Sequence, residues 1–142
     1  MLFDVITITA VTAAAVVLMF NTKDYINYTE ATRAMEHLGK IVLGYREQHG
    51  SVPPQSFIDE IEENLPGYAR IGRLHYRAQW IDFGAPPDEI LAYVEKNYHS
   101  FFVSSGFIVL RLDGRVEYLD KETFREIFSK QQDPLEKEMS LQ

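Results

Sequence analysis

Residues 5–20 form an uncharged apolar run at the start of a chain whose remainder is polar and acidic. A helix that crosses a hydrocarbon core of about 30 Å needs roughly 20 residues, and residues 3–22 supply that length. A cleaved secretory signal normally begins with a positively charged region, whereas Asp4 lies there instead. A buried core helix is the third interpretation. We expect a spanning or signal-anchor helix that carries a small domain.

Small side chains recur at four-residue spacing within this run. Thr9 with Ala13, and Ala10 with Ala14, match the small-xxx-small pattern that allows membrane helices to approach one another closely. The alternative is that Ala and Thr only fill a lipid-facing surface. The pattern makes these four residues candidates for packing against other transmembrane helices, so the expected partners are a membrane and other protein subunits.

The composition of the chain excludes several kinds of chemistry. The 142 residues include no cysteine, which rules out a disulfide, a thiolate metal site and a cysteine nucleophile. The formal net charge is −7 and the basic residues form no block. Binding to nucleic acid requires clustered cations that neutralise phosphates, so we expect no nucleic-acid partner.

Residues 28–49 carry the pattern of an amphipathic helix. Apolar side chains recur there at steps of three and four residues and form one stripe: Ala31, Ala34, Met35, Leu38, Ile41, Val42 and Tyr45. Gly50 and then Pro53 end the pattern. Only a polar joint at 21–27 separates this helix from the apolar run. We therefore expect one long rod whose second half packs on a sheet through Met35, Leu38, Val42 and Tyr45.

Three weaker patterns follow the long helix. A short helix is predicted at 56–64, because its apolar residues lie on one edge and Pro66 and Gly67 follow. Residues 73–83 alternate apolar and polar side chains, which is typical of a half-buried strand. Residues 89–96 are compatible with a strand or a short helix, and the strand is the favoured interpretation.

The strongest strand signal is Asp113-Gly114, which lies between the β-rich segments 107–112 and 115–119. Asp-Gly between two such segments predicts a hairpin with a type I′ turn, in which both central residues have positive φ. Asp120 is then a candidate N-cap for a last helix.

These patterns together predict an α+β fold with a long N-terminal helix, transmembrane and then amphipathic. Its second half packs on a small antiparallel sheet of three or four strands, flanked by two short helices. The expected organisation is a membrane helix at 1–22, an α+β domain at 23–130 and a frayed polar tail at 131–142.

The order of these parts resembles that of type IV pilin-like proteins, and in layout the pseudopilins of type II secretion. In that family a Tyr-x-x-x-x-Gly-x-x-Pro segment follows the membrane helix, and Tyr45, Gly50 and Pro53 match it. The C-terminal part is similar to the prepilin-like proteins of planctomycetes, which place a His before a strand that ends in Asp-Gly. The matching residues are His99, Gly106, Asp113 and Gly114.

The resemblance implies a membrane-anchored structural subunit whose C-terminal domain lies outside the cytoplasm, at a bacterial inner membrane. The family's short basic leader and its Phe-Thr-Leu-Ile-Glu-like start do not occur in this sequence. Asp4 is the nearest counterpart of the family's early Glu, which balances a neighbouring subunit's N-terminus. A stand-alone, membrane-anchored relative is equally compatible with the resemblance.

The titratable residues form no recognisable catalytic or metal-binding motif. No two histidines are four residues apart and no His-Glu-x-x-His motif occurs, so we expect no zinc site. The carboxylates at 59–63 are expected on a solvated helix face. Some pseudopilins bind calcium in a C-terminal loop, and the resemblance implies Asp113, Glu117 and Asp120 as candidates for such a site, but the hairpin turn accounts better for Asp113. We therefore expect no cofactor, no metal and no small-molecule substrate.

The aromatic residues Tyr98, Phe101 and Phe102 cluster before the hairpin. We expect them in the core, since aromatic side chains supply much of the buried area of a small domain. A partner-binding patch is the alternative.

The expected function is that of a non-enzymatic pilin-like or pseudopilin-like subunit that acts by helix packing and protein–protein contacts. The alternative is a single-pass accessory or adaptor subunit of another membrane complex, in which Thr9, Ala10 and Ala14 contact a partner's helices.

Overall fold

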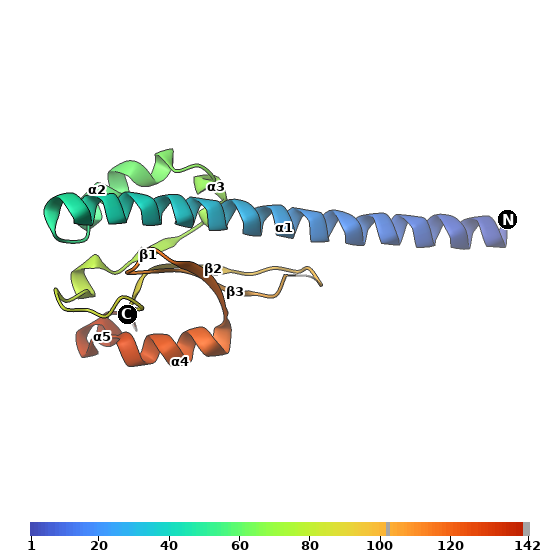
Figure 1. Cartoon of the computed structure of the whole chain (residues 1–142). Helices are drawn as coiled ribbons and strands as arrows, with labels where there is room; N and C mark the ends of the chain where they lie inside the picture. The colour runs from blue at the N-terminus through green and yellow to red at the C-terminus, as the bar shows by residue number, and fades with distance from the viewer. Residues whose placement is uncertain (102, 141–142) are drawn as a thin grey trace.

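The computed structural model describes residues 1–101 and 103–140. Its α+β fold confirms the predicted class: a long N-terminal helix packs on an antiparallel sheet with short helices around it (Figure 1). The α-helices are α1 Leu2–His49, α2 Gln55–Ile61, α3 Tyr68–Ile71, α4 Lys121–Gln131 and α5 Pro134–Ser140. The strands are β1 Leu74–Tyr76, β2 Ile90–Lys96, β3 Gly106–Arg111 and β4 Val116–Asp120. Single 3₁₀ turns occupy Glu62–Asn64 and Ala78–Trp80.

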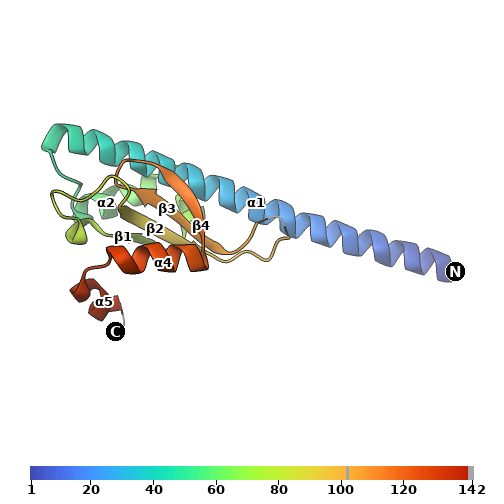
Figure 2. The ribbon, with the colours of Figure 1, turned by 60° about the horizontal axis from the view of Figure 1, so that its bottom comes forward.

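The first element, α1, is 48 residues long and is continuous through the polar joint at 21–27. No proline occurs before Pro53, so nothing in the sequence removes a helical hydrogen bond along its length. Gly50 ends it in the left-handed conformation with φ 74°, and its N–H donates to the Arg46 carbonyl at 2.8 Å. The first half of α1 projects away from the folded domain (Figures 1 and 2).

The sheet is an antiparallel meander in the order β1-β2-β3-β4. The second half of α1 contacts β3 and β4 on one face, and α4 covers the other face (Figures 1 and 2). The helices α2 and α3 pack against α1. Because both faces of the sheet are covered, nearly every residue of β3 is buried, and apolar side chains follow one another instead of alternating with polar ones.

Two apolar clusters correspond to the two faces. The larger one joins Met35 and Leu38 of α1 to Ile108 and Leu110 of β3. The smaller one joins alternate residues of the sheet to α4 and contains Ile90, Val109, Phe124 and Phe128. A bulge between Ile90 and Ala92 shifts the β2–β3 register, so that Leu91 and Ala92 both face the larger cluster.

The segment 89–96 is the strand β2, as predicted, but the expected strand at 73–83 ends early. Pairing with β2 stops at Tyr76, and residues 78–80 form a 3₁₀ turn. The N–H of Arg77 donates to the carbonyl of the bulged Leu91 at 2.8 Å. The carbonyl of Arg77 accepts from Trp80 N at 2.8 Å. The bulge in β2 removes the next regular partner, so the chain turns although the alternation continues.

The β3–β4 hairpin is confirmed, but its predicted turn type is wrong. Gly114 has φ 87°, and no non-glycine residue that the structure describes has positive φ. Gly114 N donates to the Arg111 carbonyl at 3.0 Å, and Arg111 N to the Arg115 carbonyl at 2.8 Å. These bonds define a three-residue loop, a type I turn followed by a glycine bulge. The Asp113 carboxylate accepts from Arg115 N at 3.0 Å, which stabilises a turn with negative φ at position 113.

The helix α4 begins where the sequence predicts. The expected frayed tail is wrong, because residues 134–140 form the helix α5. Asp120 Oδ1 accepts from the N–H groups of Glu122 at 3.0 Å and Thr123 at 2.9 Å. After α4 the chain turns back and forms α5. Burial of Glu136 against Arg77 holds α5 on the domain.

Candidate functional sites: an exposed apolar helix end and a lateral pocket

The first half of α1 is the largest exposed apolar surface among the described residues. It belongs to a helix that is long and apolar enough to span a membrane, and no residue of its most apolar 18-residue window is buried. This exposure contradicts the interpretation as a buried core helix. Its large exposed side chains include Phe3, Val5, Ile6, Ile8, Val11, Val16, Val17, Leu18, Met19 and Phe20.

The polar side chains of this half bond within the helix. The hydroxyls of Thr7, Thr9 and Thr12 each donate, at 2.8 Å, to the carbonyl four residues earlier. Lipid offers no hydrogen-bond partners, so these bonds allow a Thr-containing helix to lie in it. Thr9, Ala10, Ala13 and Ala14 are all exposed, and nothing in the described chain covers them.

Most of the predicted helix–sheet contacts lie in the larger cluster. Met35, Leu38 and Val42 are buried in it. Tyr45 lies elsewhere: its half-exposed ring stacks on His49 at 4.0 Å between ring centroids and tilts against Phe57 of α2 at 5.1 Å. The end of the stripe therefore faces α2 because α1 extends past the sheet there.

The hairpin turn is fastened to α1. A Cβ at Gly114 would lie 2.5 Å from Leu43 Cδ1, and the φ of 87° at this position also favours glycine. Arg46 Nη1 donates to the Leu112 carbonyl at 2.7 Å. Asp113 and Gly114, predicted for the turn, thus also serve as the contact between the hairpin and the helix.

The aromatic cluster before the hairpin is not a core. Phe101 is 87% exposed, so its predicted burial is wrong. Tyr98 is half-buried, and Phe102 lies outside the described residues. The loop that holds Phe101 extends beyond the end of the sheet (Figure 1), where neither α1 nor α4 covers that side chain.

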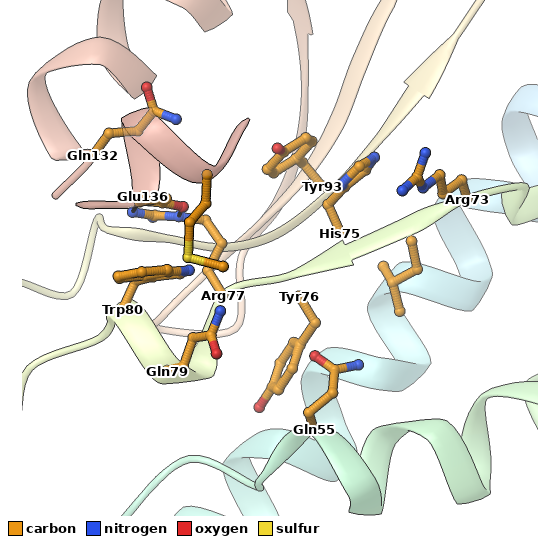
Figure 3. A pocket seen from close by; sticks show the side chains of 12 residues that line it. Gln55, Arg73, His75, Tyr76, Arg77, Gln79, Trp80, Tyr93, Gln132 and Glu136 are labelled. Carbon is orange, nitrogen blue, oxygen red and sulfur yellow. Dashed lines mark hydrogen bonds and ion pairs between the residues drawn. The ribbon is translucent and has the colours of Figure 1, made fainter. Parts of the chain in front are cut away.

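A pocket of about 840 Å³ opens between β1, the 3₁₀ turn after it and α5. Figure 3 shows its labelled side chains, with Trp80 on one side and the rings of His75 and Tyr93 on another. Those two rings stack at 4.8 Å between centroids, with 6° between their planes. His75 faces away from Leu74 and Tyr76, as its place in the strand predicts, since both neighbours pack on the larger cluster.

The floor of the pocket is the buried ion pair of Arg77 and Glu136. Arg77 Nε and Nη2 donate to the two Glu136 carboxylate oxygens at 2.7 and 2.8 Å. The guanidinium also donates to the carbonyls of Ile90 and Gln131 and lies 4.9 Å from the centroid of the Phe128 ring. Because these contacts occupy the guanidinium on all sides, Arg77 joins α5 to the sheet and is not free to bind a ligand.

The sequence did not predict this ion pair, although it carries a signal for the helix α5. Asp133-Pro134 combines a capping residue with the residue preferred at the first helical position. In the structure Asp133 Oδ1 accepts from Leu135 N at 2.8 Å. The pattern locates α5, but no local pattern pairs Glu136 with a residue 59 positions earlier.

His75 and Glu89, two ionisable groups close to the pocket or to its ion pair, have shifted pKa values. Burial, with help from the nearby Arg73 guanidinium, lowers the pKa of His75, so its imidazole is neutral at pH 7. Burial also raises the pKa of Glu89, which lies 3.6 Å from Arg77. Among the described residues no three His, Cys, Asp or Glu side chains group to hold a metal. The expectation that the chain is not an enzyme stays a prediction.

The remaining histidines lie apart from one another. His37 is exposed on α1, and His49 Nδ1 lies 3.0 Å from the Tyr45 carbonyl oxygen near the helix end. His99 contributes its backbone N–H to a contact with α1. The carboxylates of Asp59, Glu60 and Glu63 face solvent as expected, whereas Glu62 is half-buried and accepts from the Tyr68 hydroxyl at 3.5 Å.

Comparison with protein-family models, characterised proteins and solved structures finds no match to this chain.

Proposed function

We propose that the chain is a non-enzymatic structural subunit, anchored in a membrane by the first half of α1, that acts through helix packing and protein–protein contacts as pilin-like and pseudopilin-like subunits do. The observation that supports this most is the continuity of α1. One helix passes without a break from an exposed apolar half into the core of a folded domain. Such a rod couples the position of the domain to the packing of its membrane helix.

The partners in this proposal are other subunits that contact α1 within the membrane. Thr9 with Ala13, and Ala10 with Ala14, offer small side chains on one side of the helix, where another helix can approach closely. In this proposal α1 spans a bacterial inner membrane and the folded domain lies on the side away from the cytoplasm, as the pilin resemblance implies.

The test begins with the full-length chain produced in bacteria, followed by alkaline extraction of the membranes. We expect the chain to remain in the membrane fraction, and a variant that lacks residues 1–24 to be soluble and folded. Recovery of the full-length chain as a soluble monomer would overturn the proposal. Unfolding of the truncated domain would show that the first half of α1 is part of the domain's core.

The second step tests helix packing in detergent by native mass spectrometry and electron microscopy. We expect Ala10→Leu to reduce self-association, because a larger side chain separates the helices. Successive helical residues turn by about 100°, which places Ala15 opposite the centre of the small-residue face, so Ala15→Leu is the matched control. Equal effects of both substitutions would contradict the packing surface. Recovery only with unlike subunits would favour the adaptor function.

A further inference from the structure

The β2–β3 loop, residues 97–105, leaves the sheet and runs along α1 toward its apolar half (Figures 1 and 2). Two hydrogen bonds from the loop backbone fix it there. His99 N donates to Asp24 Oδ2 at 2.9 Å, and Phe101 N donates to Asn21 Oδ1 at 2.9 Å. Asn21 is only 6% exposed, although Phe20 and Thr22 on either side of it are exposed. The loop therefore covers one side of α1 at the end of the apolar half.

Hydrogen bonds within the loop hold its shape. Ser105 Oγ accepts from Tyr98 N at 2.9 Å and donates to the Tyr98 carbonyl at 3.2 Å. Val103 N donates to Ser100 Oγ at 2.9 Å, and the Tyr118 hydroxyl donates to the Ser104 carbonyl. These bonds to β4, to α1 and within the loop hold its described residues at one position, beside Asn21 and Asp24.

That position is the depth at which the membrane surface is expected. Asn21 directly follows the apolar run 5–20, so in a spanning helix it lies where the hydrocarbon core meets the headgroups. Its side chain also donates to the Val17 carbonyl at 2.8 Å, which keeps it against the helix. Because Phe101 N lies 2.9 Å from this side chain, the backbone that carries the Phe101 ring lies at the same depth.

The side chains of the loop suit a membrane interface. Phe101 is 87% exposed, whereas Phe124 and Phe128 of the same domain are buried. Burying a Phe side chain is favourable, and Phe101 does not obtain this gain in water. Residues 97–105 contain no Asp, Glu, Lys or Arg in a chain that is 25% charged. Tyr25, exposed one turn beyond Asn21 on α1, adds an aromatic side chain of the kind enriched at bilayer surfaces.

We propose that the β2–β3 loop is a second membrane contact, in which Phe101 inserts between the headgroups and the acyl chains beside α1. This inference rests on the proposed anchoring of α1. Because the loop carries no Lys or Arg, the contact depends on apolar burial and needs no anionic lipid.

The contact has a consequence for the orientation of the domain. A single spanning helix by itself leaves open the direction in which it tilts, and with it the side of the domain that comes closest to the bilayer. An insertion on one side of that helix fixes which face of the domain turns toward the bilayer and which faces away. Subunits that share this orientation present the same lateral surfaces to one another.

The experiment uses the full-length chain in phosphatidylcholine vesicles. The absence of native cysteines allows a fluorescent label to be attached at one introduced cysteine. Three variants are labelled: Phe101→Cys in the loop, Thr12→Cys inside the apolar run, and Phe83→Cys as the control. Phe83 is fully exposed, like Phe101, but lies beside Arg46 and Gly50 at the other end of α1. Lipids with a nitroxide at a shallow or a deep position of the chain serve as quenchers.

We expect the label at position 12 to be quenched by the deep nitroxide, the label at 101 by the shallow one, and the label at 83 by neither. A label at 101 that is as accessible to water-soluble quenchers as the label at 83, while position 12 is deep, would overturn the loop contact and leave the anchor intact. That result would assign the exposed Phe101 to a protein partner. A label at 12 in water would overturn the anchor itself, and the loop contact with it.

Discussion

The two halves of α1 share one helix and have opposite surroundings. Leu18 in the first half is 63% exposed, and Leu38 in the second half is 0% exposed. Apolar side chains occur on every side of the first half but on one stripe of the second. A helix that is apolar all round needs an apolar medium, whereas a striped helix needs only one packing partner. The change from one pattern to the other therefore marks where the lipid-compatible half ends and the domain begins.

The largest expected effect is the difference in domain stability between the same substitution, Leu to Ala, made in each half of α1. Leu38→Ala should destabilise the domain by about 2–5 kcal/mol, because it leaves a cavity in the larger apolar cluster. Leu18→Ala should change the stability of the domain by less than about 0.5 kcal/mol, because the side chain is largely exposed and belongs to neither apolar cluster. Denaturant unfolding of the full chain in detergent, followed by the fluorescence of the single Trp80, measures both. Similar losses for the two variants would mean that the first half is packed after all.

A second pair of variants sharpens the comparison within the packed half. A Cβ at Gly39 would meet Leu110 Cδ1 at 2.9 Å and the Gly114 carbonyl oxygen at 3.1 Å, whereas a Cβ at Gly44 would meet nothing within 4 Å. Gly44→Ala should stabilise the domain by about 1 kcal/mol through helix propensity. Gly39→Ala should destabilise it by about 1 kcal/mol or more through overpacking. The same unfolding assay distinguishes them, and a stabilising Gly39→Ala would contradict the close contact between α1 and the hairpin.

The smallest expected effect is a difference in the response to pH. Residues 2–22 contain one ionisable side chain, Asp4, so retention in the membrane should not change between pH 7 and 5. In the domain, burial lowers the pKa of His75 below its ordinary value. The unfolded chain then binds more protons than the folded one as the pH falls below about 6.5, and stability is lost on acidification.

The size of this pH effect can be measured against a variant that keeps the ring stack. The contribution of the half-exposed His75 should stay below about 1 kcal/mol because solvent screens it. His75→Phe preserves stacking on Tyr93 and removes the titrating group. We expect its melting temperature to fall less than that of the unmodified chain between pH 7 and 5. Parallel pH profiles would show that other groups cause the loss.

Much of the architecture followed from local patterns. The stripe through Met35 and Leu38, the N-cap at Asp120 and the Asp113-Gly114 turn each depend on residues close together in the chain, so spacing alone predicted them. The strand at 73–83 was predicted too long, because the bulge in β2 that ends its pairing lies more than ten residues away. The Arg77–Glu136 ion pair and the helix α5 that it holds were missed, since their contact joins distant segments.

Sequence alone determined that α1 would be one rod with a lipid-compatible half and a striped half, because helix periodicity and side-chain polarity are local properties. Only the tertiary structure decided that Phe101 is exposed and not buried. An apolar residue in a loop is buried only where another layer covers it, and the hydrogen bonds to Asn21 and Asp24 carry this loop past the end of the sheet. The same bonds place it beside the boundary that the sequence had marked on the helix.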